Sequence, residues 1–405
     1  MSARMMQGDC PKGYKQTEVG VIPEDWVPTA IGNIAPIATG STPPTGDSEN
    51  YGDEFLFVSP ADMGSTKYIS VTGKMLSKKG FSVSRQFPAG SILFVCIGST
   101  IGKCGIASET LTSNQQINAI FPVAGNSPDY LYYAISAAST SVKALAGEQA
   151  VPIVNKSQFA ETKIPLPPTK AEQEAIAEAL SDADALIESL EQLIAKKRQV
   201  KQGAMQELLT GKRRLPGFSG EWEVKRLGDV LKFQVGFPFG SAYFNEASQG
   251  IRLVKNRDLK SDDQVFFYSG NYNQDFLVQD GDVLVGMDGD FLPCLWSKGL
   301  ALLNQRVGRI VPRLGLHREF AYYYLLEPLK AIENMTSSTT VKHLSHGDIE
   351  GIEKALPAVE EQTAIAAILS DMDAEIAELE AKLAKARQVK QGMMQELLTG
   401  RIRLV

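Results

Sequence analysis

One segment of this chain occurs twice, and this repeat limits the folds that the chain can adopt. Residues 172–211 and residues 361–400 align without a gap at an offset of 189 residues, and about 28 of roughly 40 positions are identical. Two unrelated amphipathic helices that share only their composition do not reach such an identity. The sequence therefore predicts a tandem duplication.

Each copy of the repeat has the apolar spacing of a long helix. Its apolar residues alternate at intervals of three and four, which is the a/d pattern of a coiled coil. Serine–aspartate pairs that begin at Ser181 and Ser370 are suited to capping, so each copy is either one long helix or a short helix followed by a long one. Lysines interrupt the pattern, which consists of Leu180, Ala183, Ile187, Leu190, Ile194, Ala204 and Leu208, broken by Lys197 and Lys201, and of Leu369, Met372, Ile376, Leu379, Leu383, Ala386, Met393 and Leu397, broken by Lys390.

The ends of the predicted helices carry capping signals. Thr169 stands three residues before Glu172, which is the spacing of a capping box. Gly211 and Gly400 predict the helix ends, because glycine readily adopts the left-handed conformation that is common there. At ~1.5 Å per residue the whole segment spans roughly 55 Å as one helix. Such a helix serves as a spacer or as a docking surface.

The regions before the two helices are also related, although more distantly. Landmarks recur in the same order, such as Trp26 with Trp222 and Asn114-Gln115 with Asn304-Gln305. Short β-rich runs bounded by glycines and turn residues lie between the landmarks, together with a few helical segments. This pattern predicts two α+β domains of about 150 residues each. The expected boundaries are 1–168 and 215–357 for the domains, and 169–214 and 358–405 for the helix regions.

Composition indicates the compartment and the class of protein. The chain has 405 residues, 43 % of them hydrophobic, which is enough for two or three cored domains. No apolar run approaches the ~18 residues of a membrane span, and residues 1–10 lack the apolar block of a signal peptide. The four cysteines form no CxxC pair. We therefore expect a cytoplasmic protein that does not bind membranes.

The charge is unfavourable for binding nucleic acid without help. The net charge is −6, made up of −1 for residues 1–168, 0 for 169–214, −3 for 215–357 and −2 for 358–405. No segment is a polycation that would bind a phosphate backbone by itself. DNA binding by this chain would depend on local basic faces and on a partner that carries more positive charge.

The chain lacks the motifs of the common catalytic sites. Residues 98–104 resemble a phosphate-binding loop, but one residue is missing between the glycines and a cysteine replaces the serine or threonine that holds magnesium, so a strand–turn–strand is the better interpretation. His343 and His346 have no further ligands nearby, which favours a surface position over a metal site. No nucleophile elbow and no methyltransferase motif occur. We expect a non-catalytic chain without a metal or a cofactor.

Basic, amide and aromatic residues gather in the predicted turns of the two domains. Arginine recognises guanine, and asparagine or glutamine recognises adenine, through paired hydrogen bonds. Taken alone, such residues are more often ordinary solvated surface, and the tyrosine pairs that recur in both domains fit a core better than a stacking platform. The candidate DNA-binding residues are Lys67, Lys78, Lys79, Arg85, Lys103, Asn114, Gln115, Arg252, Lys255, Asn256, Arg257, Asn304, Gln305 and Arg306.

The repeated helix contains a motif that resembles the pattern of a known protein family. The motif LPP…EQ…IA..L…D..I..LE, continued by MQ.LLTG and by residues 213–222, closely resembles the specificity subunit of Type I restriction-modification systems. The resemblance covers essentially the whole chain, including the entry segment at residues 13–26. The order of variable domain, helix, variable domain, helix is the order in that family.

The resemblance implies an internal pseudo-two-fold architecture, in which two long antiparallel coiled-coil helices separate two target-recognition domains. Each domain would recognise one half of a bipartite double-stranded DNA target, and the helices would set the gap and dock two modification (methyltransferase) subunits. Methylation with S-adenosylmethionine would belong to these partners, and ATP-driven cleavage to restriction subunits where they are present. The residues expected to pair the helices or to meet the partner are Ile187, Leu190, Ile194, Met205, Leu208, Leu209, Ile376, Leu379, Leu383, Met394, Leu397 and Leu398.

Two other hypotheses also account for a duplication. The chain would be a coiled-coil scaffold whose domains bind ligands other than DNA, or a pseudo-dimeric enzyme with a site between its domains. Neither explains why the helices stay nearly identical while the domains diverge. A shared partner that docks on both helices does explain it.

Overall fold

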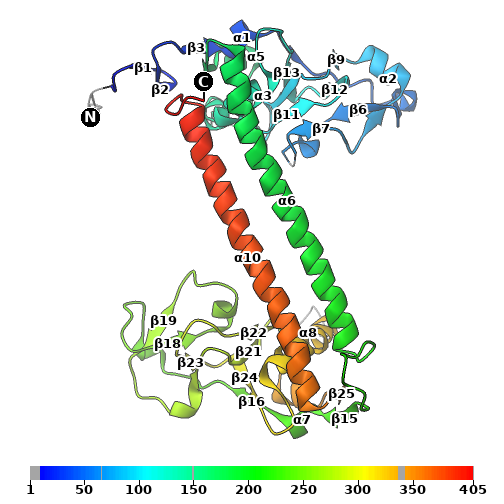
Figure 1. Ribbon diagram of the computed structural model, residues 1–405, viewed down its shortest axis with the longest axis vertical. Helices are drawn as coiled ribbons and strands as arrows, with labels where there is room; N and C mark the ends of the chain where they lie inside the picture. Colours follow the sequence, from blue (N-terminus) through cyan, green and yellow to red (C-terminus); the bar gives the residue numbers. More distant parts are fainter. Residues whose placement is uncertain (1–9, 65, 148–149, 336–342, 405) are drawn as a thin grey trace. The chain divides into compact units, whose positions relative to one another are not determined.

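The computed structural model describes residues 10–64, 66–147, 150–335 and 343–404. Residues 1–9, on which most of the expectation about a signal peptide rests, lie outside the described residues. The chain divides into two compact units (Figure 1). Unit 1 comprises residues 1–190 and 382–405, and unit 2 comprises residues 191–381. Each unit therefore combines one sheet-rich domain with part of each repeat helix.

The two repeat segments are single uninterrupted helices. Helix α6 (Lys170–Leu208) and helix α10 (Val359–Leu397) have 39 residues each. The alternative of a short helix followed by a long one is therefore wrong, and Ser181 lies within the helix, where its hydroxyl is within hydrogen-bonding distance of the Tyr133 hydroxyl at 3.2 Å. Every residue of the predicted apolar pattern is buried or half-buried, which confirms the period of the helices.

Within each unit the two helices pack antiparallel. In unit 2, Lys197 pairs with Glu375 at 2.5 Å, and Lys201 pairs with Asp373, so residue numbers rise along α6 as they fall along α10. In unit 1, Lys390 on α10 pairs with Asp184 on α6. The lysines that interrupt the apolar pattern therefore reach carboxylates of the facing helix. They belong to the helix pair itself.

A tyrosine joins each domain to the helix that follows it in sequence. The Tyr133 hydroxyl donates to Asp184 at 2.7 Å in unit 1, and the Tyr323 hydroxyl donates to Asp373 at 2.8 Å in unit 2. Both rings are buried, at 1 % and 4 % exposure, which confirms the prediction that they are core residues. The same two carboxylates accept the lysines of the facing helix. Each carboxylate thus connects three elements within its unit.

The helix ends agree with the sequence only in part. Gly211 and Gly400 have φ angles of 70° and 68°, as predicted for glycines that end helices. At the start of α6 the Thr169 hydroxyl accepts the Glu172 amide at 3.2 Å, which is one half of a capping box. The Glu172 carboxylate does not complete the box as predicted, because it binds an arginine instead.

Two buried glutamates each bind an arginine from beyond the end of a repeat helix. In unit 2, Arg214 makes a bidentate contact with Glu361 at 2.6 and 2.7 Å. In unit 1, Arg403 makes the equivalent contact with Glu172 and also binds Asp25. Both glutamates are 1 % exposed. We call these contacts the arginine–glutamate locks, and they were not predicted from the sequence.

The domain of unit 1 contains two five-stranded sheets. The helices α3 (Pro128–Ala137) and α5 (Lys156–Glu161) contribute Tyr130, Leu131 and Phe159 to the same buried cluster as the first sheet. This cluster also contains Leu397 and Leu398 from α10. The strand orders are β4 (Ile37–Thr39), β13 (Ile117–Ile120), β10 (Ile92–Val95), β11 (Cys104–Ala107) and β7 (Tyr68–Ile69) for the first sheet, and β5 (Tyr51–Gly52), β8 (Met75–Leu76), β6 (Phe55–Val58), β12 (Leu111–Ser113) and β9 (Gln86–Phe87) for the second.

The domain of unit 2 repeats this plan. Its helix α8 (Arg318–Met335) corresponds to α3, and its helix α9 (His346–Glu350) corresponds to α5. The predicted class, two related α+β domains combined with two long helices, is therefore confirmed. The strand orders are β16 (Leu231–Val235), β24 (Val307–Pro312), β21 (Val283–Gly286) and β22 (Pro293–Leu295) for one sheet, and β17 (Phe244–Asn245), β19 (Phe266–Tyr268), β18 (Ile251–Val254), β23 (Ala301–Leu303) and β20 (Leu277–Val278) for the other.

A glycine allows two backbone segments to touch at the same place in each domain. A Cβ atom on Gly40 would lie 2.2 Å from the carbonyl oxygen of Asn114, and one on Gly236 would lie 2.1 Å from that of Asn304. Replacing Gly236 with alanine would force these segments apart, and we expect it to lower the free energy of unfolding by about 2 kcal/mol. Denaturant unfolding measures this change.

Gly392→Ala is the matched control for this prediction. Gly392 lies inside α10, and a Cβ atom on it would have nothing within 4 Å. Alanine has a higher helix propensity than glycine, so we expect this variant to be more stable by about 0.5–1 kcal/mol. An equal loss of stability in both variants would contradict the role assigned to Gly236.

Candidate nucleic-acid interface

In each unit, turns that follow corresponding strands meet at one edge of the domain. We call this region the loop edge. In unit 1 the Gln116 side-chain amide donates to the Ile97 carbonyl at 3.4 Å, and in unit 2 the Met287 amide donates to the Arg306 carbonyl at 2.9 Å. The loop edge consists of residues 40–42, 97–103 and 114–116 in unit 1, and of residues 236–239, 287–292 and 304–306 in unit 2.

The loop edge of unit 1 presents an exposed amide. The Gln115 side chain is exposed, and its Oε1 atom accepts the Thr42 hydroxyl at 2.6 Å. Asn114 is used internally, because its side chain bonds both the backbone and the side chain of Gln116, at 3.1 and 3.0 Å. Of the predicted pair, Gln115 is therefore available to a ligand, and Asn114 shapes the turn.

Two basic candidates of unit 1 belong to the loop edge, as Lys103 does, or lie next to it, as Arg85 does. The Arg85 guanidinium donates to the Thr39 carbonyl at 2.6 Å, next to Gly40. The Lys103 ammonium donates to the Pro60 carbonyl at 2.9 Å. Residues 98–103 connect the antiparallel strands β10 and β11, which confirms the strand–turn–strand interpretation of this glycine-rich segment.

The loop edge of unit 2 presents an arginine in addition to the exposed Gln305, the counterpart of Gln115. Arg306 has a φ of 72°, and its side chain is 58 % exposed. Its NH1 atom lies 3.3 Å from Oδ1 of Asp288, and Nδ1 of His343 lies 2.9 Å from the same oxygen. The candidate Asn256 also belongs to this group, because its side chain donates to the Asp288 carbonyl at 2.7 Å. The structure therefore brings Asn256 and Arg306 together through Asp288.

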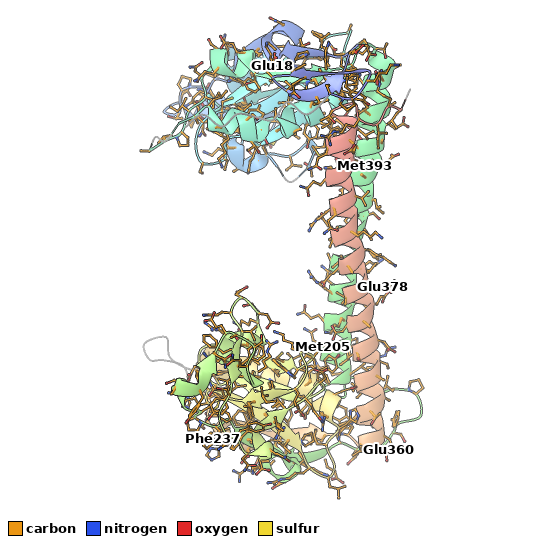
Figure 2. All side chains as sticks on the ribbon, turned by 90° about the vertical axis from the view of Figure 1, so that its left-hand side faces the viewer. Glu18, Met205, Phe237, Glu360, Glu378 and Met393 are labelled. Carbon is orange, nitrogen blue, oxygen red and sulfur yellow. The ribbon has the colours of Figure 1, made fainter. Side chains whose placement is uncertain are left out.

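An exposed aromatic ring lies beside this arginine turn. Phe237 is 45 % exposed, and its backbone bonds Leu303 and Gln305, at 2.9 and 3.0 Å. In the view of Figure 2, Phe237 lies on the side of unit 2 that is turned away from α10. Gln305 is exposed, whereas Asn304 is 7 % exposed. Sequence reasoning missed Phe237 and Asp288, and the signal that could have indicated Phe237 was its place directly after the recurring glycine.

Three basic candidates of unit 2, Arg252, Lys255 and Arg257, form a cluster along the sequence. Most of this cluster is paired with carboxylates or packed on aromatic rings. Arg252 is 14 % exposed, pairs with Asp262 at 2.5 Å and lies over the Trp296 ring at 5.0 Å. The Lys255 ammonium lies 3.2 Å from the centroid of Phe266, and burial lowers the pKa of this lysine.

Arg257 is 48 % exposed, but its guanidinium donates to the Gln264 carbonyl at 3.3 Å. This contact leaves part of the guanidinium for a phosphate. None of the three basic residues of the cluster extends freely into solvent.

Three lysine candidates of unit 1 lie outside the loop edge. Lys67 is 11 % exposed, and its ammonium binds Asp129 at 2.6 Å and the Ser181 hydroxyl at 2.8 Å, so it supports the junction of the domain with α6. Lys79 binds Asp47 and Glu49, and the hydrogen bond with Asp47 is the main cause that raises the pKa of Lys79 to about 12. Lys78 is exposed. Only Lys78 of these three is free for a phosphate.

The residues predicted to pair the helices or to meet a partner fall into three groups. The leucines at the ends of the helices, Leu208, Leu209, Leu397 and Leu398, are between 4 % and 7 % exposed and belong to the cores of their own units, so they cannot form an exposed partner surface. Met205 and Met394 are half-buried. The remaining six, Ile187, Leu190, Ile194, Ile376, Leu379 and Leu383, lie in the apolar pattern along which the helices pack.

A groove of about 810 Å³ lies beside Met394 in unit 1. It is lined by the last turns of α10 and by α3, α4 (Ser139–Ala144) and α5. Ala137 and Leu145 are exposed members of its apolar wall. Met393, labelled in Figure 2, marks this end of α10. Met205, the counterpart of Met394, lines a hollow of about 540 Å³ in unit 2 with Ile376 and Ala377.

Two features of other protein classes are absent from the part of the chain that the structure describes. It contains no group of three or more histidine, cysteine, aspartate or glutamate side chains placed to hold a metal ion. Within the same described ranges, none of the helices is both long and apolar enough to cross a membrane.

Comparisons with known proteins agree on one family. The model of the Type I restriction modification DNA specificity domain matches residues 23–197 and again residues 219–388. The specificity subunit of the Type I restriction enzyme MjaIX from Methanocaldococcus jannaschii is 26 % identical over 429 aligned residues. The alignment covers 96 % of each chain. The EcoBI specificity subunit of Escherichia coli is 34 % identical over 186 residues, which cover 45 % of this chain and 39 % of that one.

Solved structures share the fold. The crystal structure of a Type I restriction-modification S subunit from M. genitalium superposes with a TM-score of 0.60 at 16 % identity, covering 92 % of this chain and 96 % of that one. A chain from a study of the assembly and conformational transition of the type I R-M system gives a TM-score of 0.56 at 18 % identity, covering 94 % of this chain and 99 % of that one.

Proposed function

Because the chain belongs to the family of Type I restriction modification DNA specificity domains, we propose that its two units recognise the two halves of a bipartite DNA target. The chain is the DNA-recognition subunit of such a system. The observation that supports one half-site for each unit is the repeated loop edge, which has the same position in both domains but different side chains. Unit 1 exposes Gln115, whereas unit 2 exposes Arg306 in addition to Gln305, the counterpart of Gln115. Related scaffolds with different contact residues suit two different half-sites.

Mapping of methylated adenines tests this function. The full chain would be produced with its modification subunit in cells that lack other adenine methylation, and the methylated sites would be sequenced. We expect two short conserved sequences separated by a gap of fixed length. Exchanging residues 1–168 for the first domain of a relative should change one conserved sequence and leave the other as it was. A single uninterrupted target would contradict the assignment of one half-site to each unit.

The chain would act together with other subunits of the system. We assign it no catalytic role and no cofactor, so that methylation with S-adenosylmethionine belongs to two modification subunits and ATP-dependent cleavage to restriction subunits where they are present. The net charge of −6 supports this division, because a net negative charge opposes strong binding to a phosphate backbone. Tight, sequence-specific binding by the isolated chain at about 150 mM salt would contradict it.

The helices would hold the two half-sites at a fixed separation. Helix α6 begins in unit 1 and ends in unit 2 without a break, and α10 runs from unit 2 back into unit 1. Ion pairs and apolar contacts between α6 and α10 favour a stiff helix pair over a flexible linker. No specific observation favours the scaffold or the enzyme hypothesis.

The groove beside Met394 is our candidate docking site for a modification subunit. Most of its exposed surface is apolar, although Glu18, Glu161 and Lys163 also line it. It lies at the end of a repeat helix and contains the exposed Ala137. Ala137→Arg would place a charge in the groove without replacing a core residue. We expect this variant to lower the amount of modification subunit that copurifies with the chain about tenfold or more, since an unpaired charge in an apolar interface costs several kcal/mol.

Thr140→Arg is the control for the groove variant. Thr140 is exposed on α4 but does not line the groove, so the same added charge should leave copurification unchanged. Equal copurification of both variants would exclude the groove as the docking site.

A further inference from the structure

Arg306 occupies a backbone conformation that arginine does not favour. The turn at residues 304–307 is closed by a hydrogen bond from the Val307 amide to the Asn304 carbonyl, at 3.2 Å, and Arg306 is its third residue. A positive φ at this position is typical of type II turns, where glycine is preferred. In the described part of the chain, Ser248 is the only other non-glycine residue with a positive φ. Strained residues of this kind cluster at binding sites.

The same turn in unit 1 has no strain. Its third residue, Gln116, is not among the residues with a positive φ, and its amide donates to Oδ1 of Asn114 at 3.1 Å. In unit 2 this side-chain hydrogen bond is missing, because Oδ1 of the buried Asn304 has no partner among the described residues. The turn of unit 2 therefore lacks one side-chain hydrogen bond and has a strained backbone at Arg306. The contacts of Arg306 within unit 2 do not explain this loss of stability.

The Arg306 guanidinium is oriented but not saturated. Its NH1 atom faces Asp288, which is also bound by His343. No partner of its Nε and NH2 atoms is found in the residues that the structure describes. A guanidinium held in this way loses less conformational entropy when it binds, and its free edge presents two parallel donors. The O6 and N7 atoms of guanine accept such a pair in the major groove.

We propose that Arg306 recognises a guanine in the half-site of unit 2. The proposal rests on the function proposed above and adds the residue and the base. The other arginines near this surface are less suited, because Arg252 is 14 % exposed and paired, and Arg257 is bonded to Gln264. At the equivalent position of unit 1, the Gln116 side chain accepts from Asn114 and donates to the Ile97 carbonyl, so it is already bonded within the unit. This arginine–guanine contact is therefore specific to the half-site of unit 2.

The test is Arg306→Gly in the full chain, produced with its modification subunit. Glycine fits the positive φ, so the midpoint of thermal unfolding should stay the same or rise. Methylation mapping should show an unchanged gap and an unchanged half-site for unit 1. In the other half, the preference for guanine at one position should fall about tenfold, because a bidentate arginine–guanine contact is worth ~1–3 kcal/mol.

Arg401→Ala is the matched control. Its side chain is also 58 % exposed and also faces a carboxylate, Glu396 at 3.4 Å, but it lies beyond the end of α10 and outside both loop edges. This variant should leave both half-sites unchanged. If the wild type gives a bipartite target and Arg306→Gly gives the same one, the assignment of Arg306 is wrong. If the wild type gives no bipartite target, the proposed function itself fails and the inference falls with it.

Discussion

Lengthening both repeat helices by four residues should widen the gap between the two half-sites by about two base pairs. One insertion would duplicate residues 190–193 in α6, and the other would duplicate residues 377–380, which are LEQL and AELE in the sequence. Each adds ~6 Å of helix, close to two base pairs at ~3.4 Å each. An insertion of four residues is a stutter, which a coiled coil accommodates by local unwinding. Methylation mapping measures the new gap.

The helix pair explains why both helices should be lengthened. Lys197 pairs with Glu375 and Lys201 with Asp373, so an insertion in α6 alone would shift these residues along an unchanged α10. The single insertion is therefore expected to lower stability in addition to changing the gap. Four extra residues after Gly125, a loop position where an added Cβ atom would have nothing within 4 Å, are the control and should leave the gap unchanged. An unchanged gap in the doubly lengthened chain would show that the helices do not set the separation.

Arg403→Leu should lower the free energy of unfolding by about 3 kcal/mol. The substitution leaves the Glu172 carboxylate, 1 % exposed, without its cation in a buried site. Removing one partner of a buried pair costs ~3–5 kcal/mol, and the lower end applies because Arg403 is itself one-third exposed. Arg214→Leu should have a similar effect through Glu361 in unit 2. Denaturant unfolding of both variants measures the change.

A variant that lacks both members of an arginine–glutamate lock distinguishes the cost of burying an unpaired charge from the loss of packing contacts. Glu172→Met combined with Arg403→Leu leaves no buried charge unpaired, because Asp25, the other partner of Arg403, is 52 % exposed. The double variant should therefore recover most of the lost stability. A double variant that is less stable than Arg403→Leu alone would contradict the explanation. It would mean that the contacts of Glu172 other than those with Arg403 dominate.

The sequence predicts the helices well because their signal is local and periodic. The spacing from Leu180 to Leu208 survives as the buried face of α6, and Gly211 ends the helix through its positive φ. The partners of Lys197 and Lys201 could not be predicted, because they lie more than 170 residues away. The locks were detectable in principle, since Arg214 and Arg403 are related by the same offset as the two glutamates.

The candidate interface was predictable in place but not in detail. The recurrence of Asn-Gln in both domains marked the turns that form the loop edge. Nothing in the sequence indicates that Asn114 is bonded inward while Gln115 faces solvent, because the turn conformation decides this. The counts of basic residues were a poorer guide, since Lys67 and Arg252 are held by carboxylates that only the fold brings near.

Unit 1 is built from two segments that lie far apart in the sequence, and this affects how it folds during synthesis. This unit needs residues 382–405, which include Arg403. During translation the first domain leaves the ribosome long before the segment that completes its core with Leu397 and Leu398. Unit 2 consists of one continuous segment, so it can close first. The domain that is synthesised first is therefore completed last, and until then its unfinished apolar surface is a natural site for chaperones.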